Sequence, residues 1–320
     1  MISAMRLLLK THVLTIVQLF AFFAAAYSQQ YPVFTQYYFN ELVINPAYAG
    51  AHVQFSASAM YRNQWVNFPG APRTLNFSAH TSLMKNKIGV GFMVNRDEIG
   101  SYKNNHIYGS YAYKIHLQQA TLSMGLQAGV NVLGVNFDGI DLRNPGDVSF
   151  TNIIGEVKPN FGAGIFFSKK SFFAGFSVPF ILNNKVATSA EDILAEIREA
   201  RYYFIRSGFI MSLDRMNNVK LSPSMLIRTQ EGQPLSFDIN TAVIFYDVFS
   251  LGTSYRLGDS FITYIDLKIS DKIHFGYSYD LTTSDINAHS NGTHEFMLNF
   301  RSILRGIHKD PECPQYYQYR

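Results

Sequence analysis

The residues able to do chemistry do not form a pattern that a catalytic or metal site requires. His294-Glu295 is an isolated dipeptide, and the chain has no His-Glu-x-x-His, Gly-x-Ser-x-Gly or Walker A motif. In an extended strand the two side chains of this dipeptide point to opposite faces, so they cannot share a metal ion. The single cysteine, Cys313, leaves too few thiols for a Cys-based zinc site or a disulfide framework. We therefore predict no enzyme activity and no cofactor.

Three weaker patterns have simple interpretations. Gly162-Ala-Gly164 is interpreted as a strand with lumenal glycines rather than as a phosphate-binding loop, and Asn291-Gly-Thr293 as a chance glycosylation sequon. Cys313 either contacts a periplasmic partner or is an idle thiol.

The composition is unusual for a soluble protein of 320 residues. Charged residues make up 16% and aromatic residues 15%, yet the mean hydropathy is −0.02. Soluble domains carry about a quarter charged residues. A membrane barrel explains the values, because one strand face meets lipid while the other meets water. The net charge of +4 without a basic block gives no support for nucleic-acid binding.

The N-terminus predicts export. Arg6 and Lys10 precede an apolar stretch over residues 13–26, and small residues at Ala26 and Ser28 suit cleavage before Gln29. We predict a signal peptide over residues 1–28; the alternative is an N-terminal membrane anchor.

Period-two alternation recurs along the chain and predicts strands. Phe296, Leu298 and Phe300 alternate with polar residues near the C-terminus. The polar faces are rich in Gly, Ser and Asn with little charge, as in a crowded lumen. We predict an all-β transmembrane antiparallel barrel of about fourteen strands over residues 53–301, followed by a periplasmic tail over 302–320. The expected strands are 53–62, 74–82, 87–96, 104–116, 120–135, 160–168, 171–179, 201–213, 219–228, 235–245, 248–256, 260–269, 272–280 and 293–301.

The predicted connections alternate in length, as in bacterial barrels with short periplasmic turns and longer outer loops. The connection over 96–103 is expected to be intermediate, and that over 257–259 short. Pro223 lies within a predicted strand and predicts a bulge or kink there. A short helix is expected near Ser189-Ala-Glu-Asp192, either over the outer mouth or simply solvated.

Residues 29–52 precede the first strand and are too apolar for a linker. We expect this N-terminal periplasmic or lumenal segment to be buried as a hatch in the pore or against the periplasmic mouth. The alternative is that it only tucks in the terminus.

Several motifs resemble one known family. Phe34-Thr-Gln-Tyr-Tyr-Phe-Asn40, Ile44-Asn-Pro-Ala-Tyr-Ala-Gly50, Tyr61-Arg-Asn-Gln-Trp65 and Phe68-Pro-Gly-Ala-Pro-Arg-Thr74 resemble the PorP/SprF family, together with Cys313-Pro314. The resemblance implies a barrel like the fatty-acid transporters in the outer membrane of Bacteroidota, within the type IX secretion system. It also implies roles in protein export, surface attachment of adhesins and gliding motility. The implied partners are outer-membrane lipid, periplasmic ring lipoproteins or translocon components, and secreted proteins with C-terminal sorting domains.

The candidate structural or partner motif consists of residues from these blocks. Its members are Asn45, Pro46, Ala47, Tyr48, Gly50, Arg62, Gln64, Trp65, Pro69 and Pro72. Arg62 and Trp65 either form a binding surface or loop anchor, or belong to a lumenal salt bridge and an aromatic girdle.

Two other functions compete with secretion. The strand count suits a hydrophobic-solute channel of the fatty-acid-transporter type. An outer-membrane enzyme would need a Ser/His/Asp cluster at the outer rim, which the sequence does not display. We expect both chain ends to be periplasmic.

Overall fold

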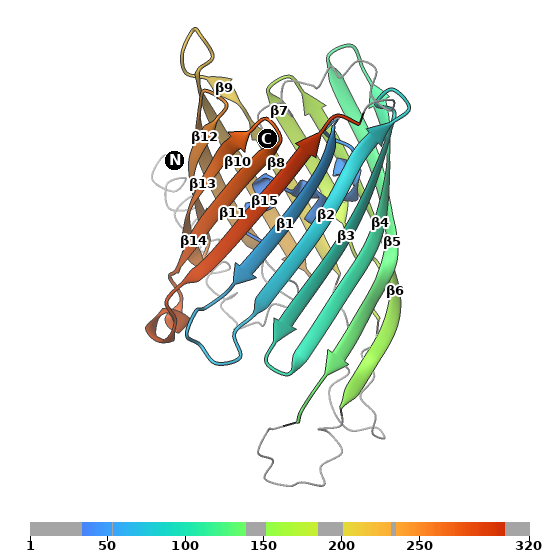
Figure 1. Ribbon diagram of the computed structural model, residues 1–320, viewed down its shortest axis with the longest axis vertical. Coiled ribbons are helices and arrows are strands. Elements are labelled where there is room, and N and C mark those ends of the chain that lie inside the picture. The colour runs from blue at the N-terminus through green and yellow to red at the C-terminus, as the bar shows by residue number, and fades with distance from the viewer. Residues whose placement is uncertain (1–33, 53, 139–151, 185–200, 232–234, 305–320) are drawn as a thin grey trace, which may run out of the picture.

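The computed structural model shows a closed antiparallel β-barrel (Figure 1). It describes residues 34–52, 54–138, 152–184, 201–231 and 235–304. The predicted signal peptide, the helix near residue 189 and Cys313 lie outside these residues. Strands β8 and β9 both pair with β10, so they share one position and the wall has fourteen strands. The barrel closes through the β1–β15 and β10–β11 pairs, which confirms the predicted fold class.

The strands agree closely with those expected. Their bounds are β1 Phe55–Asn63, β2 Arg73–Leu83, β3 Ile88–Ile99, β4 Tyr102–His116, β5 Ala120–Val135, β6 Ile153–Lys169, β7 Phe172–Val178, β8 Tyr202–Phe209, β9 Met211–Ser212, β10 Val219–Gln230, β11 Ser236–Phe245, β12 Phe249–Arg256, β13 Ser260–Ser270, β14 Ile273–Thr282 and β15 Thr293–Ser302.

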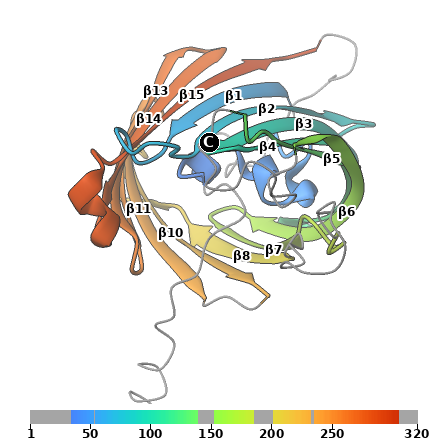
Figure 2. The ribbon, with the colours of Figure 1, turned by 90° about the horizontal axis from the view of Figure 1, so that it is seen from below.

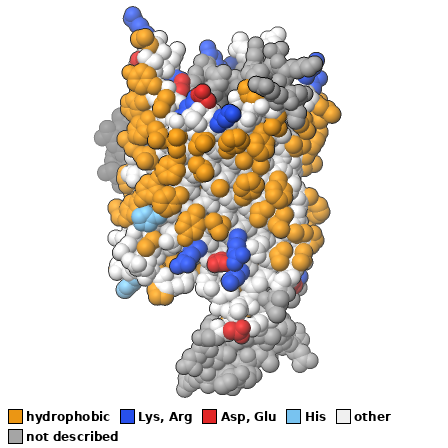
Figure 3. All heavy atoms as spheres, in the orientation of Figure 1, with side chains coloured by type: hydrophobic (Ala, Val, Ile, Leu, Met, Phe, Trp, Pro, Cys, Tyr) orange, Lys and Arg blue, Asp and Glu red, His pale blue; other side chains and the backbone are white. Residues whose placement is uncertain are grey.

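Alternation decides which side chains face out. In β15, Phe296, Leu298 and Phe300 are 42–52% exposed, whereas Glu295 and Asn299 are buried inside. The same rule covers the outer wall with a band of hydrophobic side chains (Figure 3). No helix among the described residues is long and apolar enough to cross a membrane.

Three local expectations need correction. The connection expected over 96–103 is a two-residue turn at Gly100 and Ser101, because Gly100 adopts the positive φ (55°) that tight hairpins need. Strand β6 starts at Ile153, before the expected residue 160. Of the bulge or kink expected at Pro223, the bulge is wrong, because pairing with β11 continues through Pro223 without a shift. The strand pairing is instead interrupted on the other side of β10, between β8 and β9.

The longest connections lie at one end of the barrel, as predicted, although the turn at Gly100 and the 257–259 connection at that end are short. Turns such as 117–119 and 271–272 lie at the top of Figure 1, and the longer 64–72 and 283–292 lie at the bottom. We call these the short-turn end and the long-loop end.

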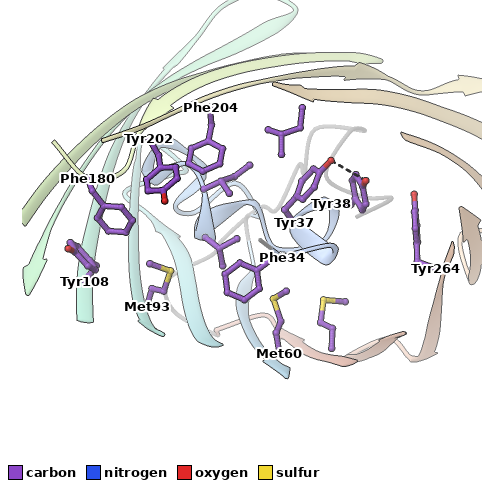
Figure 4. Close-up of a cluster of buried hydrophobic side chains, with 14 of the residues drawn as sticks. Phe34, Tyr37, Tyr38, Met60, Met93, Tyr108, Phe180, Tyr202, Phe204 and Tyr264 are labelled. Carbon is purple, nitrogen blue, oxygen red and sulfur yellow. Dashed lines mark hydrogen bonds between the residues drawn. The ribbon is translucent and has the colours of Figure 1, made fainter. Parts of the chain in front are cut away.

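The N-terminal segment, residues 34–52, lies inside the barrel (Figure 2). It contains three short 3₁₀ helices, η1 Gln36–Tyr38, η2 Glu41–Val43 and η3 Pro46–Tyr48. Figure 4 shows Phe34, Tyr37 and Tyr38 directed toward wall residues that include Met60 and Tyr264. The hydrophobic core of the protein therefore sits between this segment and the barrel wall.

Candidate functional site

The start of the N-terminal segment is held by a buried charge network. The backbone N–H groups of Thr35 and Gln36 donate to the Glu295 carboxylate at 2.8 and 2.7 Å. Arg62 donates to Glu295 at 2.9 Å and to Asp280 at 2.8 Å, and Thr35 Oγ1 donates to Asp280 as well. Arg62 is 3% exposed, so removing it would leave the buried Asp280 and Glu295 carboxylates without their cation. This network joins the segment to β1, β14 and β15.

A second buried ion pair holds the middle of the segment on the opposite wall. Glu41 of η2 accepts from Arg206 of β8, and both side chains are nearly inaccessible. The guanidinium also lies 5.2 Å from the Tyr37 ring centre and 5.0 Å from that of Phe173. Such aromatic contacts favour a desolvated cation. The segment is thus attached to one side of the lumen by hydrogen bonds to the Glu295 carboxylate and to the other side by the Glu41–Arg206 ion pair.

The Asn-Pro-Ala-Tyr-Ala-Gly block forms the turn that ends the segment. Asn45 Oδ1 accepts from the Ala47 N–H at 2.9 Å, capping η3, and Asn45 Nδ2 donates to the Ile165 carbonyl at 3.1 Å. Pro46 suits the first helical position because its nitrogen has no N–H to satisfy. Gly50 adopts φ 65°, a conformation that favours glycine, where the chain turns toward β1.

Wall glycines allow this turn to approach the strands closely. A Cβ on Gly125 of β5 would overlap the backbone of Ala47, and one on Gly89 of β3 would overlap the Ala49 carbonyl. Ser123 donates to the Ala47 carbonyl at 2.7 Å. Gly164, from the Gly-Ala-Gly stretch, faces Asn45 and so occupies a lumenal position as predicted.

A histidine pair lies beside this turn. His52 stacks on His80 with ring centres 5.4 Å apart, and the Tyr48 hydroxyl lies 3.4 Å from His52 Nε2. Burial lowers the pKa of His52 well below its usual value, and the positive charges of Arg301 and Lys114 act in the same direction. His52 is therefore neutral near pH 7. Among the described residues, no cluster of three or more His, Cys, Asp or Glu side chains could hold a metal ion.

The 64–72 loop forms a separate feature at the long-loop end. The Trp65 N–H donates to Thr293 Oγ1 at 3.1 Å, and the Val66 N–H to the Gly292 carbonyl at 2.9 Å. On its other side, the Gly100 N–H donates to the Gly70 carbonyl at 3.0 Å. The loop is thereby fastened to two neighbouring connections.

This loop encloses a hollow of about 560 Å³. Trp65, Phe68 and Pro69 line it together with Arg73 and Glu98. Trp65 and Phe68 are 3 residues apart, and their backbones are joined by a Phe68 N–H to Trp65 carbonyl hydrogen bond of 3.0 Å. A surface that combines aromatic groups with an arginine and a carboxylate can bind a polypeptide that has both apolar and charged side chains.

The predicted motif residues form two groups rather than one site. Asn45, Pro46, Ala47, Tyr48 and Gly50 are buried in the lumen. The others belong to the loop hollow or its base: Gln64, whose N–H donates to the Pro72 carbonyl at 3.0 Å, Trp65 and Pro69. Arg62 links the groups, because it lies next to the last residue of the strand that leads into the loop and binds both Thr35 and Glu295.

Sequence reasoning missed the residues that hold the lumenal network. Glu41, Arg206, Asp280 and Glu295 were not among the candidates. The available signal was a charged residue on the polar face of an otherwise weakly charged strand, as at Glu295, which faces inward while His294 lies on the outer side and contacts Tyr277.

Solved structures with similar folds are membrane barrels of low sequence identity. The Acinetobacter baumannii outer membrane protein Omp33 is 10% identical, with a TM-score of 0.43 over 79% of this chain and 100% of that one. The CymD monoaromatic hydrocarbon channel is 10% identical, with a TM-score of 0.47 over 88% of this chain and 96% of that one. The NanC porin is 9% identical, with a TM-score of 0.39 over 78% and 100% of the two chains.

No curated protein matches the chain in sequence. A family model described as "Type IX secretion system membrane protein PorP/SprF" matches residues 26–300, which includes the N-terminal segment and nearly the whole barrel. The chain therefore belongs to the PorP/SprF family, and it is an outer-membrane β-barrel of the type IX secretion system.

Proposed function

We propose that this barrel supports export or surface attachment of secreted proteins by binding their C-terminal sorting domains at the 64–72 loop. The observation that carries the proposal is the loop hollow, which combines Trp65 and Phe68 with Arg73 and Glu98 at the long-loop end. Hydrogen bonds to the neighbouring connections hold this loop in place before any partner arrives. A preorganised surface of this kind binds with a smaller loss of entropy. No catalytic step is part of the proposal.

The orientation is part of the same proposal: the long-loop end faces outward, and the chain ends face the periplasm. Bacterial barrels place their longer loops outside. The short-turn end is suited to periplasmic machinery. Two turns on this side, at residues 84–87 and 170–171, carry Lys85, Lys87 and Lys170, and neither they nor the turn between them at 117–119 has an acidic residue. This favours an acidic partner surface.

The N-terminal segment argues against the alternative of a hydrophobic-solute channel. Its residues cross the lumen. They are bound to one wall by the buried Glu41–Arg206 ion pair and to the other by hydrogen bonds from the Thr35 and Gln36 N–H groups to the buried Glu295 carboxylate. We propose that it acts as a hatch that closes the pore. Solute transport would require these contacts to break, and breaking a buried ion pair such as Glu41–Arg206 costs about 3–5 kcal/mol.

The experiment compares surface attachment of secreted proteins in cells that carry the native chain or Trp65→Ala/Phe68→Ala. The matched control is Leu257→Ala, which removes a 62% exposed side chain from another connection at the same end. We expect loss of attachment only in the loop variant, with equal barrel levels in the outer membrane. Normal attachment in the loop variant contradicts the proposal, as does solute flux through the native barrel in liposomes.

A further inference from the structure

The outer wall carries a charged row whose position is set by strand pairing. On the outward face of β2, β3 and β4, Arg73 lies opposite Glu98, and Glu98 lies opposite Lys103. The next row toward the barrel centre contains Leu75 opposite Arg96, and the row after that contains only Phe77, Val94 and Ile107. The charges therefore begin where the apolar band ends, on the face shown in Figure 3.

This charged row is not neutral. Arg96 pairs with Glu98 at 2.5 Å, and the two side chains are 51% and 35% exposed. Arg73 and Lys103 are also exposed and flank the same carboxylate. Three cations thus surround one anion, which leaves two positive charges at the edge of the band. Guanidinium groups bind phosphate through two parallel hydrogen bonds.

An apolar hollow of about 450 Å³ lies directly beside this row. Its lining includes Ala59, Phe77, Phe296 and Leu298, and Arg96 lies at its edge. Pairing explains the hollow, because the small Ala59 stands between Leu298 of β15 and Phe77 of β2. A gap among large side chains on a lipid-facing wall can be filled by a lipid chain.

We propose that this part of the wall binds one phosphorylated lipid of the outer leaflet. One acyl chain fills the hollow beside Ala59, and a phosphate binds Arg96 with support from Arg73 and Lys103. The cationic row lies just beyond the apolar hollow at the edge of the band. This arrangement supports a lipid rather than a membrane-spanning protein segment, since an anionic lipid carries its phosphate just beyond its acyl chains. The proposal shares with the proposed function the outward orientation of the long-loop end and the residues Arg73 and Glu98, which also line the loop hollow.

Native mass spectrometry of the full barrel in detergent tests the phosphate half. The probe is lipid A with its phosphates, compared with the same lipid after phosphate removal. We expect the native barrel to retain lipid A at least about tenfold more strongly than the dephosphorylated form, because the loss of one charge-assisted hydrogen bond weakens binding by about that factor or more. Arg96→Ser should abolish this preference and Arg96→Lys should restore part of it.

The matched control for Arg96→Ser is Arg201→Ser, which removes a partly exposed arginine at the long-loop end but away from the hollow. Ala59→Phe should fill the hollow and weaken the binding of both lipids. Ala174→Phe changes a small β7 residue that does not line the hollow, so it should leave the binding of both lipids unchanged. Folding of each variant is checked by the heat-modifiable mobility of the barrel.

Three outcomes would overturn the proposal: equal retention of both lipids by the native barrel, equal losses in Arg96→Ser and Arg201→Ser, or equal losses in Ala59→Phe and Ala174→Phe. Neither Arg96 nor Ala59 lines the loop hollow. Failure of lipid binding is therefore distinguishable from failure of partner attachment at Trp65.

Discussion

Glu41 and Arg206, which are 165 positions apart in sequence, form an ion pair inside the barrel with side-chain exposures of 1% and 2%. The pair joins the N-terminal segment to β8, on the wall opposite the Arg62–Glu295 network. A segment held at one wall only could swing aside, whereas attachment at two walls keeps it across the lumen. The stability of the closed barrel should therefore depend on both attachments.

The first prediction concerns this pair. Glu41→Gln should destabilise the barrel by about 3–5 kcal/mol, because it leaves the Arg206 charge buried without a counter-charge. Glu41→Gln/Arg206→Met should recover much of the loss, since the methionine can pack between Tyr37 and Phe173. Urea unfolding followed by the fluorescence of Trp65, the single tryptophan, measures both. Equal losses in the single and double variants would show that the charge pairing is unimportant.

The second prediction concerns closure of the pore. Gly125→Leu should push Ala47 away from β5 and displace the N-terminal segment, because no Cβ fits at this position. Ion conductance in planar bilayers should rise relative to the native barrel. Gly109→Leu is the matched control, because Gly109 has no atoms within 4 Å of an added Cβ. A native-like conductance in Gly125→Leu would mean that the segment does not close the pore.

The third prediction concerns pH. Because burial lowers the pKa of His52, the unfolded chain binds a proton near pH 6.5 while the folded barrel does not. The contribution of neutral His52 to the free energy of unfolding is therefore fully present above about pH 6.5. It is lost as the pH falls, by up to about 1.4 kcal/mol per pH unit. The free energy of unfolding should differ less between pH 7.5 and pH 5.0 in His52→Asn than in the native barrel. His289→Asn, at an exposed loop position, serves as the control. An unchanged pH dependence in His52→Asn would contradict the assignment.

The fourth prediction concerns orientation. In a Cys313→Ser background, Asn287→Cys places a thiol in the 283–292 loop, and Met216→Cys places one in a short turn. Both positions are exposed. A membrane-impermeant maleimide should label intact cells only at position 287, and both positions after the outer membrane is opened. Labelling of position 216 on intact cells would reverse the orientation and move the proposed lipid site to the inner leaflet.

The wall was predictable because its signal is local. Alternation of Phe296, Leu298 and Phe300 with polar residues sets the two faces of β15 without reference to any other strand. Pro223 shows where this reasoning fails. The chain alone indicates that Pro223 disturbs a strand, but only the pairing places the break in the neighbouring strand, near Ile210.

By itself, the sequence determined the strands, their faces, the alternation of short and long connections and the apolar character of the N-terminal segment. The tertiary structure decided what these elements meet. The Arg206–Glu41 ion pair forms only once the barrel has closed. The Arg96–Glu98 pair lies beside an apolar hollow only once the strand register is set. The physical reason is that side-chain direction follows from the local backbone, whereas a charge pair across the lumen depends on the placement of every strand between its partners.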